Sequence, residues 1–523
     1  MREKHRIVRL AKPVRKGLLH LVFSRFLIFI LLMALQVSIF GALYGWLSHL
    51  SRYTVVAQMI FTTVAVVYLF NNGMDTSAKL TWMLLIALFP LPGAALLAFT
   101  QLNLGHRRLK QRVDSRISES RTALPQPDGV MKSLEAEGDG IEDLVHYLNR
   151  SGCFPAYQDT AVSYYPSGED VFPVMLEELE KAERYIYLEC FIIEEGYMWG
   201  QVLDTLIRKA EAGVDIRVMY DGMCEVFTLP HAYWKLLEEQ GIQAKPFAPI
   251  RPVVSSHYNY RDHRKILVID GRVAFTGGVN LADEYINHTV RFGHWKDTAV
   301  MLRGQAARSY TLMFLQLWNA QDVLPLSLPK MEDFPVDAPA PGGTVIPYCD
   351  CPLDEDKVGE TVYMDILYRA TDYVHIMTPY LILDGEMEAA LKYAAERGVD
   401  VRIILPGIPD KKTANALAKS HYKRLTASGV KLYEYTPGFV HAKVFVSDDR
   451  KAVVGTINLD YRSLYHHFEC AAFLYKVPCI PDIEQDFQET LAKCRPVTEE
   501  IIQQEKFSVR FLGTLVKFVA PLF

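Results

Sequence analysis

The sequence predicts an α/β fold with two similar βαβ halves, preceded by an α-helical transmembrane block. Three observations predict it: uncharged apolar runs near the amino terminus, a strand–helix–strand pattern that occurs twice, and a histidine motif that recurs with the same downstream spacing. At about 150 residues per domain, 523 residues are also more than one core requires. We expect membrane segments over 1–104, a polar linker over 105–140, a first half over 141–340, a second half over 341–495 and an amphipathic tail over 496–523.

The amino-terminal block contains three apolar runs without a charged residue, over 26–47, 53–70 and 80–99. A transmembrane helix needs about 20 apolar residues, so the first and third runs are long enough and the second is marginal. Basic clusters flank the block on both sides, and three full crossings would place them on opposite faces, against the positive-inside rule. We therefore expect a multi-pass anchor in which one run lies in the interface or re-enters. The number of spans stays open, as does a buried helical hairpin.

The net charge and the cysteines indicate which kinds of partner and which cell compartment suit the protein. The formal net charge is −5, so the chain lacks the overall positive charge that is typical of a nucleic-acid-binding protein. A polyanion would therefore have to bind at a local group of basic residues. The eight cysteines form no zinc-like C-x-x-C pair, which predicts reduced thiols in a cytoplasmic body. The basic residues from Arg107 to Arg116 also favour the cytoplasmic side of a membrane for this body. We expect no metal and no cofactor, and we interpret the one C-x-C pair, Cys349 and Cys351, as part of a loop, with a metal site as the alternative.

After the linker the chain repeats a strand–helix–strand pattern. Apolar segments at 184–193 and 210–222 flank one helical stretch, and segments at 372–383 and 395–407 flank another. A glycine ends each helix, at Gly213 and Gly398. Such units form parallel strands covered by helices, which predicts two similar α/β halves. Chance similarity between two ordinary βαβ units would explain this part of the pattern equally well.

The histidine motif removes that alternative. His-x-Lys-x-x-x-x-Asp occurs at 263–270 and again at 441–448, and in both copies a glycine follows the histidine by 14 residues and an asparagine follows it by 17. Residues two apart on a strand share a face, so the histidine and lysine of each copy point together. Asp270 and Asp448, seven residues on, fall on the opposite face at a hairpin turn, where we expect a structural role as readily as a chemical one.

An imidazole, an ammonium group and an asparagine amide on neighbouring strands suit a tetrahedral anion such as phosphate. Two facing sets could cut and rejoin a phosphate ester, with one histidine as nucleophile and the other as acid and then base. The candidate catalytic residues are His263, Lys265, Asp270, His441, Lys443 and Asp448, and the candidate phosphate-binding residues are Asn280 and Asn458.

At these residues the sequence resembles the phospholipase D superfamily, in which two such motifs form one active site between two similar halves. More closely, it resembles the bacterial cardiolipin synthases through "YRDHRKILVIDGRVAFTGGVNLADEY" (260–285), "HWKDT" (294–298), "TPY" (378–380), "HAKVFVSDD" (441–449) and "GTINLDYRS" (455–463). It departs from that family's pattern at Asp262, at Thr456 and in "HHFE" (466–469), where "LNFE" is usual.

The resemblance implies a metal-free transfer of a phosphatidyl group from one phosphatidylglycerol to another, with release of glycerol, through a phosphohistidine. It implies His263 as nucleophile and His441 as general acid and base, although these two roles could be reversed, with lysines and asparagines around the phosphoryl oxygens. Glu284 and Glu469 are candidates for orienting an imidazole. The expected partners are membrane phospholipids, and the expected location is the bacterial plasma membrane.

Other activities fit the same motifs. A phospholipase D-type hydrolase would use water as acceptor, and a transferase could use another lipid such as phosphatidylethanolamine. A nucleic-acid phosphodiesterase and an inactive membrane scaffold fit less well, because the charge is acidic and both motifs are complete.

The carboxy-terminal stretch 506–523 places aromatic and aliphatic residues at helical spacing, with three cations between them. This pattern predicts an amphipathic helix on an anionic membrane surface. A last helix packed on the protein core would show the same periodicity, so both remain open.

Overall fold

The computed structural model describes residues 7–10, 38, 51–101, 104–152, 154–249, 260–321 and 342–520. The chain divides into two compact units. The first comprises Met1–Val14, Arg108–Ile250 and Asn259–Thr514, and the second comprises Arg15–Arg107, Arg251–Tyr258 and Leu515–Phe523. The strands of both predicted α/β halves belong to the first unit.

The first half contains a seven-stranded sheet with the order β1-β9-β7-β6-β2-β3-β4. Its parallel strands are β2 (Tyr185–Cys190), β3 (Asp215–Asp221) and β4 (Gln243–Phe247), and its antiparallel strands are β6 (Ile266–Ile269), β7 (Val273–Gly277), β9 (Ala299–Gly304) and β1 (Thr160–Tyr165). The connections include α11 (Cys224–Phe227), α12 (Tyr233–Glu238) and the 3-10 helix η2 (Asp283–Ile286).

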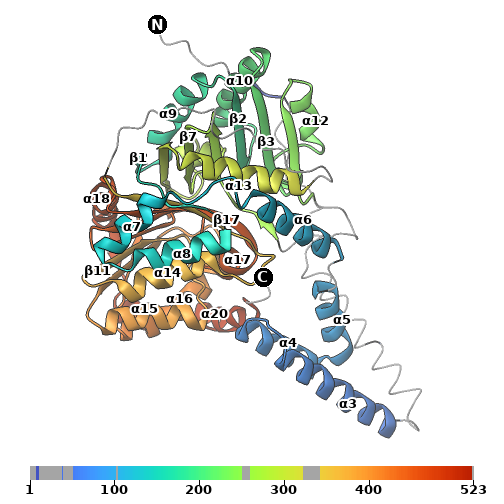
Figure 1. Ribbon diagram of the computed structural model, residues 1–523. Helices are drawn as coiled ribbons and strands as arrows, with labels where there is room; N and C mark the ends of the chain where they lie inside the picture. The colour runs from blue at the N-terminus through green and yellow to red at the C-terminus, as the bar shows by residue number, and fades with distance from the viewer. Residues whose placement is uncertain are drawn as a thin grey trace. The chain divides into compact units, whose positions relative to one another are not determined.

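Alternation along β2 explains how helices cover both faces of this sheet. Ile186 and Leu188 point into one cluster with α9 (Gly168–Glu180) and α10 (Tyr197–Glu211). Tyr185 and Tyr187 point the other way, into the cluster that contains residues of α13 (Ala307–Ala320). Figure 1 shows α13 lying across this sheet. The sheet is therefore buried on both faces, as its continuous apolar strands require.

The second half repeats this sheet strand by strand in the order β10-β17-β16-β15-β11-β12-β13, with β18 added at the edge. The strands are β10 (Thr344–Asp350), β17 (His467–Tyr475), β16 (Lys451–Gly455), β15 (Val444–Ser447), β11 (Tyr373–Met377), β12 (Asp400–Pro406), β13 (Lys431–Tyr435) and β18 (Cys494–Pro496). The helices are α8 (Ile141–Gly152), α14 (Val358–Arg369), α15 (Gly385–Glu396), α16 (Lys412–Ala427), α17 (Tyr461–Tyr465), α18 (Ile480–Leu491) and α19 (Glu499–Gln504). The predicted mixed α/β fold with two similar halves is confirmed.

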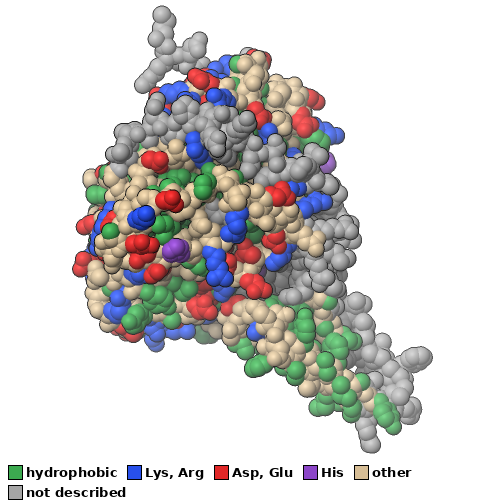
Figure 2. Space-filling view, in the orientation of Figure 1, with side chains coloured by type: hydrophobic (Ala, Val, Ile, Leu, Met, Phe, Trp, Pro, Cys, Tyr) green, Lys and Arg blue, Asp and Glu red, His purple; other side chains and the backbone are tan. Residues whose placement is uncertain are grey.

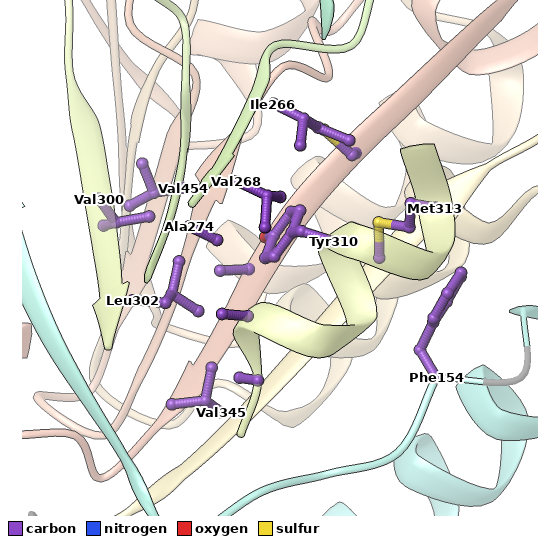
Figure 3. Close-up of a cluster of buried hydrophobic side chains, with 14 of the residues drawn as sticks. Phe154, Ile266, Val268, Ala274, Val300, Leu302, Tyr310, Met313, Val345 and Val454 are labelled. Carbon is purple, nitrogen blue, oxygen red and sulfur yellow. The ribbon is translucent and has the colours of Figure 1, made fainter. Parts of the chain in front are cut away.

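One hydrophobic core lies between the two sheets and belongs to both halves. Figure 3 shows it: Val268, Ala274, Val300 and Leu302 come from the first sheet, and Val345 and Val454 come from the second. Tyr310 and Met313 of α13 complete it. Because these side chains are buried against each other, the shared core fixes one half against the other and brings the two histidine motifs together.

Two short ladders also join the halves. The first is β5 (Arg261–Asp262), which pairs in parallel with the start of β17 in the second sheet. The second is β14 (Gly438–Val440), which pairs in parallel with β8 (His294–Lys296) of the first half. In each ladder, the strand that directly precedes a motif histidine in the sequence is hydrogen-bonded to the opposite half. These strands therefore position the two histidines.

The predicted transmembrane block is the part of the fold class that proved wrong. None of the helices in the described ranges combines the length and the apolar content that a membrane crossing requires. The run 53–70 lies in α3 (Ser51–Phe70), and the run 80–99 is split before Pro90 into α4 (Thr76–Leu88) and α5 (Pro90–Gln101). The run 26–47 lies outside the described residues except for Ser38.

Within this second unit, α3, α4 and α5 pack around Leu69, Trp82, Ile86 and Leu97. Many other apolar side chains of the same helices are exposed. Figure 2 shows hydrophobic side chains along this unit, and Met59 and Val64 are exposed by 66% and 64%.

The region predicted as a polar linker, 105–140, contains the helices α6 (Leu104–Ser120) and α7 (Asp128–Glu137). Val113 of α6 is buried in the core between the sheets, and Val130 and Leu134, one turn apart on α7, are also buried. Most of the polar residues lie on the outer faces of these helices, which explains the polar composition of the region.

Candidate active site

Backbone hydrogen bonds fix the positions of the two motif histidines. The His263 N–H donates to the carbonyl of Phe468 at 2.9 Å, and the His441 N–H donates to the carbonyl of Lys296 at 2.7 Å. Both bonds cross from one half to the other. Each imidazole is thereby set beside a carboxylate that follows closely in the opposite half.

The imidazoles and the carboxylates form two crossed pairs. Nδ1 of His263 lies 2.9 Å from both Oε1 and Oε2 of Glu469, and Nδ1 of His441 lies 2.7 Å from Oδ2 of Asp297. Both carboxylates are fully buried. A carboxylate accepts a hydrogen bond from Nδ1–H, so each ring carries its hydrogen there and leaves the Nε2 lone pair free. That tautomer is the one a nucleophile or a general base needs.

Further contacts hold the carboxylates. The Thr456 hydroxyl donates to Oε2 of Glu469, and the Thr298 N–H donates to Oδ1 of Asp297 at 2.9 Å. Since these bonds fix the acceptor, they also fix the orientation of the imidazole.

The motif lysines lie on the same face as their histidines, as predicted from the spacing. Nζ of Lys265 donates to the carbonyl of His263 at 2.7 Å. Nζ of Lys443 donates to the carbonyl of His441 and lies 2.9 Å from Nδ1 of the same ring. Two ammonium groups therefore flank the two imidazoles, an arrangement that attracts an anion.

Burial and these cations set the protonation states. Burial, followed by the charge of Lys265, lowers the pKa of His263 well below its ordinary value. Burial and Lys443 lower the pKa of His441 to about 4, and burial lowers the pKa of Lys443 to about 7. Burial opposes ionisation of Asp297, but the neighbouring His441 and Lys443 outweigh it and lower the pKa of that carboxyl. Both imidazoles are therefore neutral at pH 7 in the free protein.

This arrangement predicts loss of stability in acid. The unfolded chain takes up protons on these histidines near pH 6.5, whereas the folded site resists protonation, so stability falls as the pH drops from about 6.5 toward 4. For His441 the loss amounts to about 3 kcal/mol. Thermal unfolding at pH 7 and pH 4.5 measures it, and His441→Asn should reduce the drop. An equal drop in wild type and variant would contradict the assignment.

An asparagine of each half completes the set. Oδ1 of Asn280 accepts the Ile192 N–H at 3.0 Å, while its buried Nδ2 has no hydrogen-bond partner among the described residues. Asn458, at the same position of the second half, has a buried Oδ1 without a partner in the same part of the chain. A buried amide with an unused polar atom is costly, so both side chains are suited to a bound group.

Asp270 and Asp448 lie at the far ends of β6 and β15, and both have positive φ. Asp270 accepts the backbone N–H groups of Glu183, Arg184 and Tyr185 at 2.8 to 2.9 Å. Asp448 accepts those of Thr371, Asp372 and Tyr373 at 2.9 to 3.0 Å. Because these donors occupy the carboxylates at the start of the neighbouring strand, we propose a structural rather than a chemical role for both.

Of the two glutamates predicted to orient an imidazole, the structure brings only Glu469 to one. Glu284 accepts a hydrogen bond from Arg291 at 2.6 Å instead. Sequence reasoning missed the partner of His441, Asp297, although it lies in the stretch "HWKDT". The signal was weak because Asp297 follows its own motif histidine by 34 residues and Glu469 follows His441 by 28, so the repeat spacing does not align them.

Comparison with known proteins identifies the family of the chain. The family model for the PLD-like domain of cardiolipin synthase matches residues 175–318 and 363–491. A cardiolipin synthase of Geobacillus thermodenitrificans is 35% identical over 72% of this chain and 76% of its own, and one of a Geobacillus species is 33% identical over 85% and 88%. An uncharacterized protein of Streptococcus mutans is 54% identical over 88% of this chain and 99% of its own.

Among solved structures, phosphatidylserine synthase of Haemophilus influenzae is similar in fold, with a TM-score of 0.56 and 15% identity over 73% of this chain and 99% of that one. This likeness supports the fold alone. The family predicted from the two histidine motifs is confirmed by the sequence comparisons: the chain belongs to the cardiolipin synthase family of phospholipase D-like proteins.

Proposed function

We propose that the protein is a cardiolipin synthase that transfers a phosphatidyl group from one phosphatidylglycerol to another and releases glycerol. The observation that carries the proposal is the pair of buried imidazoles, each held through Nδ1 by a carboxylate of the other half. Two imidazoles with free Nε2 atoms, flanked by two ammonium groups, can exchange one phosphodiester bond for another.

In the first step Nε2 of His263 attacks the phosphorus of a phosphatidylglycerol. The bond from phosphorus to the glycerol oxygen breaks, and His441 protonates that oxygen so that glycerol leaves. His441 carries a proton at this point because the bound phosphate anion offsets the charges of Lys265 and Lys443, which favours the imidazolium form.

In the second step a hydroxyl of another phosphatidylglycerol loses its proton to His441 and attacks the phosphohistidine. The phosphorus–nitrogen bond breaks, cardiolipin forms and both imidazoles return to their starting state. Lys265, Lys443 and the two asparagines bind the phosphoryl oxygens, where negative charge builds up in each transition state.

Incubation of the purified protein in detergent with phosphatidylglycerol alone tests the proposal. We expect cardiolipin and glycerol in equal amounts by mass spectrometry. Phosphatidic acid as the main product would identify a hydrolase and overturn the proposal.

We also expect turnover to persist in the presence of a strong chelator, because lysine and asparagine supply the donors that a metal ion would otherwise provide. The test compares initial rates with and without EDTA, and restoration of a lost rate by Mg²⁺ or Zn²⁺ would contradict this mechanism.

A lipid substrate requires access to a bilayer, and we propose that α20 (Phe507–Val519) supplies part of it. Phe507 and Phe511 are exposed by 75% and 59%. On another face of the helix, Gly513 lies so close to α16 that an added Cβ would be 2.4 Å from the Ala416 carbonyl oxygen. The helix therefore packs on the protein and still presents aromatic side chains outward, beside Arg510, as an interfacial helix does.

Replacing both exposed aromatics, as Phe507→Gln with Phe511→Gln, should lower activity on anionic phosphatidylglycerol vesicles about tenfold or more. Activity on detergent-dispersed short-chain substrate should change less than about twofold, because the active site is untouched. Tyr393→Gln, an aromatic exposed by 52% on α15, serves as the matched control. Equal losses in both assays would show that α20 acts through stability and not through lipid contact.

A further inference from the structure

A third histidine lies beside His263 and has no part in the proposed reaction. His467 begins β17, and its ring centroid is 5.3 Å from that of His263. Its Nδ1 lies 3.7 Å from Oε1 of Glu469. The residue is only 7% exposed, and neither ring nitrogen has a hydrogen-bond partner among the described residues. An unpaired polar atom in such a place costs about 1–3 kcal/mol, so the position calls for a ligand.

The donor atoms have spacings that a metal ion can use. One ligand atom from each of His263, His467 and Glu469 lies within 4.8 Å of the others. Zn²⁺ binds nitrogen and oxygen at about 2.0–2.2 Å in a tetrahedron, which places neighbouring donors about 3.3 Å apart. Oε1 of Glu469 lies 2.9 Å from Nδ1 of His263 and 3.7 Å from Nδ1 of His467, so small side-chain rotations suffice.

The charges around this position act in opposite directions. The Glu469 carboxylate offsets part of the ion's charge. Lys265 and Lys443 oppose binding, so we expect an affinity near the micromolar range, weaker than that of a structural zinc site.

We propose that His263, His467 and Glu469 form an inhibitory site for a divalent transition-metal ion of the zinc type, on the basis of the proposed role of His263. Without metal, His263 carries its proton on Nδ1 and keeps the Nε2 lone pair for attack on phosphorus. An ion on Nδ1 replaces the hydrogen bond to Glu469, and the proton moves to Nε2. No proton leaves the ring, but the attacking lone pair is lost.

The test measures binding directly and separately from turnover. The purified full-length protein in detergent is titrated with Zn²⁺ against a chromogenic chelator, and with Co²⁺ to record the visible absorption of a tetrahedral site. We expect one ion per chain. His467→Asn should weaken binding at least tenfold and raise the half-inhibitory Zn²⁺ concentration by the same factor. His466→Asn, which changes the adjacent histidine outside the cluster, should leave both values unchanged.

Equal Zn²⁺ binding by His467→Asn and wild type would overturn the site, and Zn²⁺ binding without loss of phosphatidyl transfer would overturn its inhibitory role. His467→Gln provides a second variant, and thermal unfolding shows that each variant is folded. If the protein formed no cardiolipin at all, the proposed function would fail while the titration still decided whether the metal site exists.

Discussion

His263→Ala is expected to lower phosphatidyl transfer by roughly 10⁴-fold or more, because loss of a nucleophile removes the covalent route altogether. His441→Ala should lower turnover by about 10²–10⁴-fold, since it removes only the proton transfers. The variants differ further in the intermediate. Quenching with detergent at alkaline pH, which preserves a phosphorus–nitrogen bond, after mixing with labelled phosphatidylglycerol should leave label on His263 in the wild type and in His441→Ala.

Peptide mapping of the quenched protein identifies the labelled histidine. His263→Ala should carry no label at any time point. Label on His441 in that variant would exchange the two roles and leave the rest of the scheme intact. Label on neither histidine in any form of the protein would exclude a phosphohistidine.

Glu469→Gln and Asp297→Asn are each expected to lower kcat by about 10²–10⁴-fold while the protein remains folded. An amide in place of the carboxylate can donate a hydrogen bond to Nδ1, which moves the ring proton to Nε2 and removes the attacking or proton-accepting lone pair. KM should change little, because neither carboxylate is among the groups proposed to contact lipid.

A matched control exists in the same chain. The buried His375 pairs with the partly exposed Glu484 at 2.9 Å outside the site. Glu484→Gln should therefore leave kcat within about twofold of the wild type. If Glu484→Gln and Glu469→Gln lost activity equally, the effect would be one of folding, and the crossed pairs would have no special role.

The sequence alone predicted much of the site because the repeat is local. His263 and Lys265 share a strand face, and Asn280 follows on the next strand, so periodicity and spacing suffice to group them. The carboxylate partner of each histidine could not be predicted in this way. Asp297 and Glu469 reach their imidazoles only through ladders between the halves, and no local pattern records which residue lies opposite in another sheet.

In the amino-terminal block, a local sequence pattern led to a wrong prediction. Hydropathy over 80–99 indicated a span, but Phe89 and Pro90 end one helix and start another, and length is what a crossing depends on. No sequence pattern indicated the proposed metal-binding role of His467 in "HHFE". Only the positions of the rings show that His467 faces His263 and that His466 stands outside the cluster.

The crossed pairing also sets the order in which a newly made chain gains reactivity. Glu469 is synthesised 206 residues after His263. At about 5–20 residues per second this is an interval of roughly 10–40 seconds. During that time the first half can fold on the ribosome with its motif complete, yet its histidine has no carboxylate to set the tautomer. A growing chain, or a product truncated before residue 469, therefore lacks the contact that sets the tautomer of His263, and by the proposed mechanism it would not transfer a phosphatidyl group.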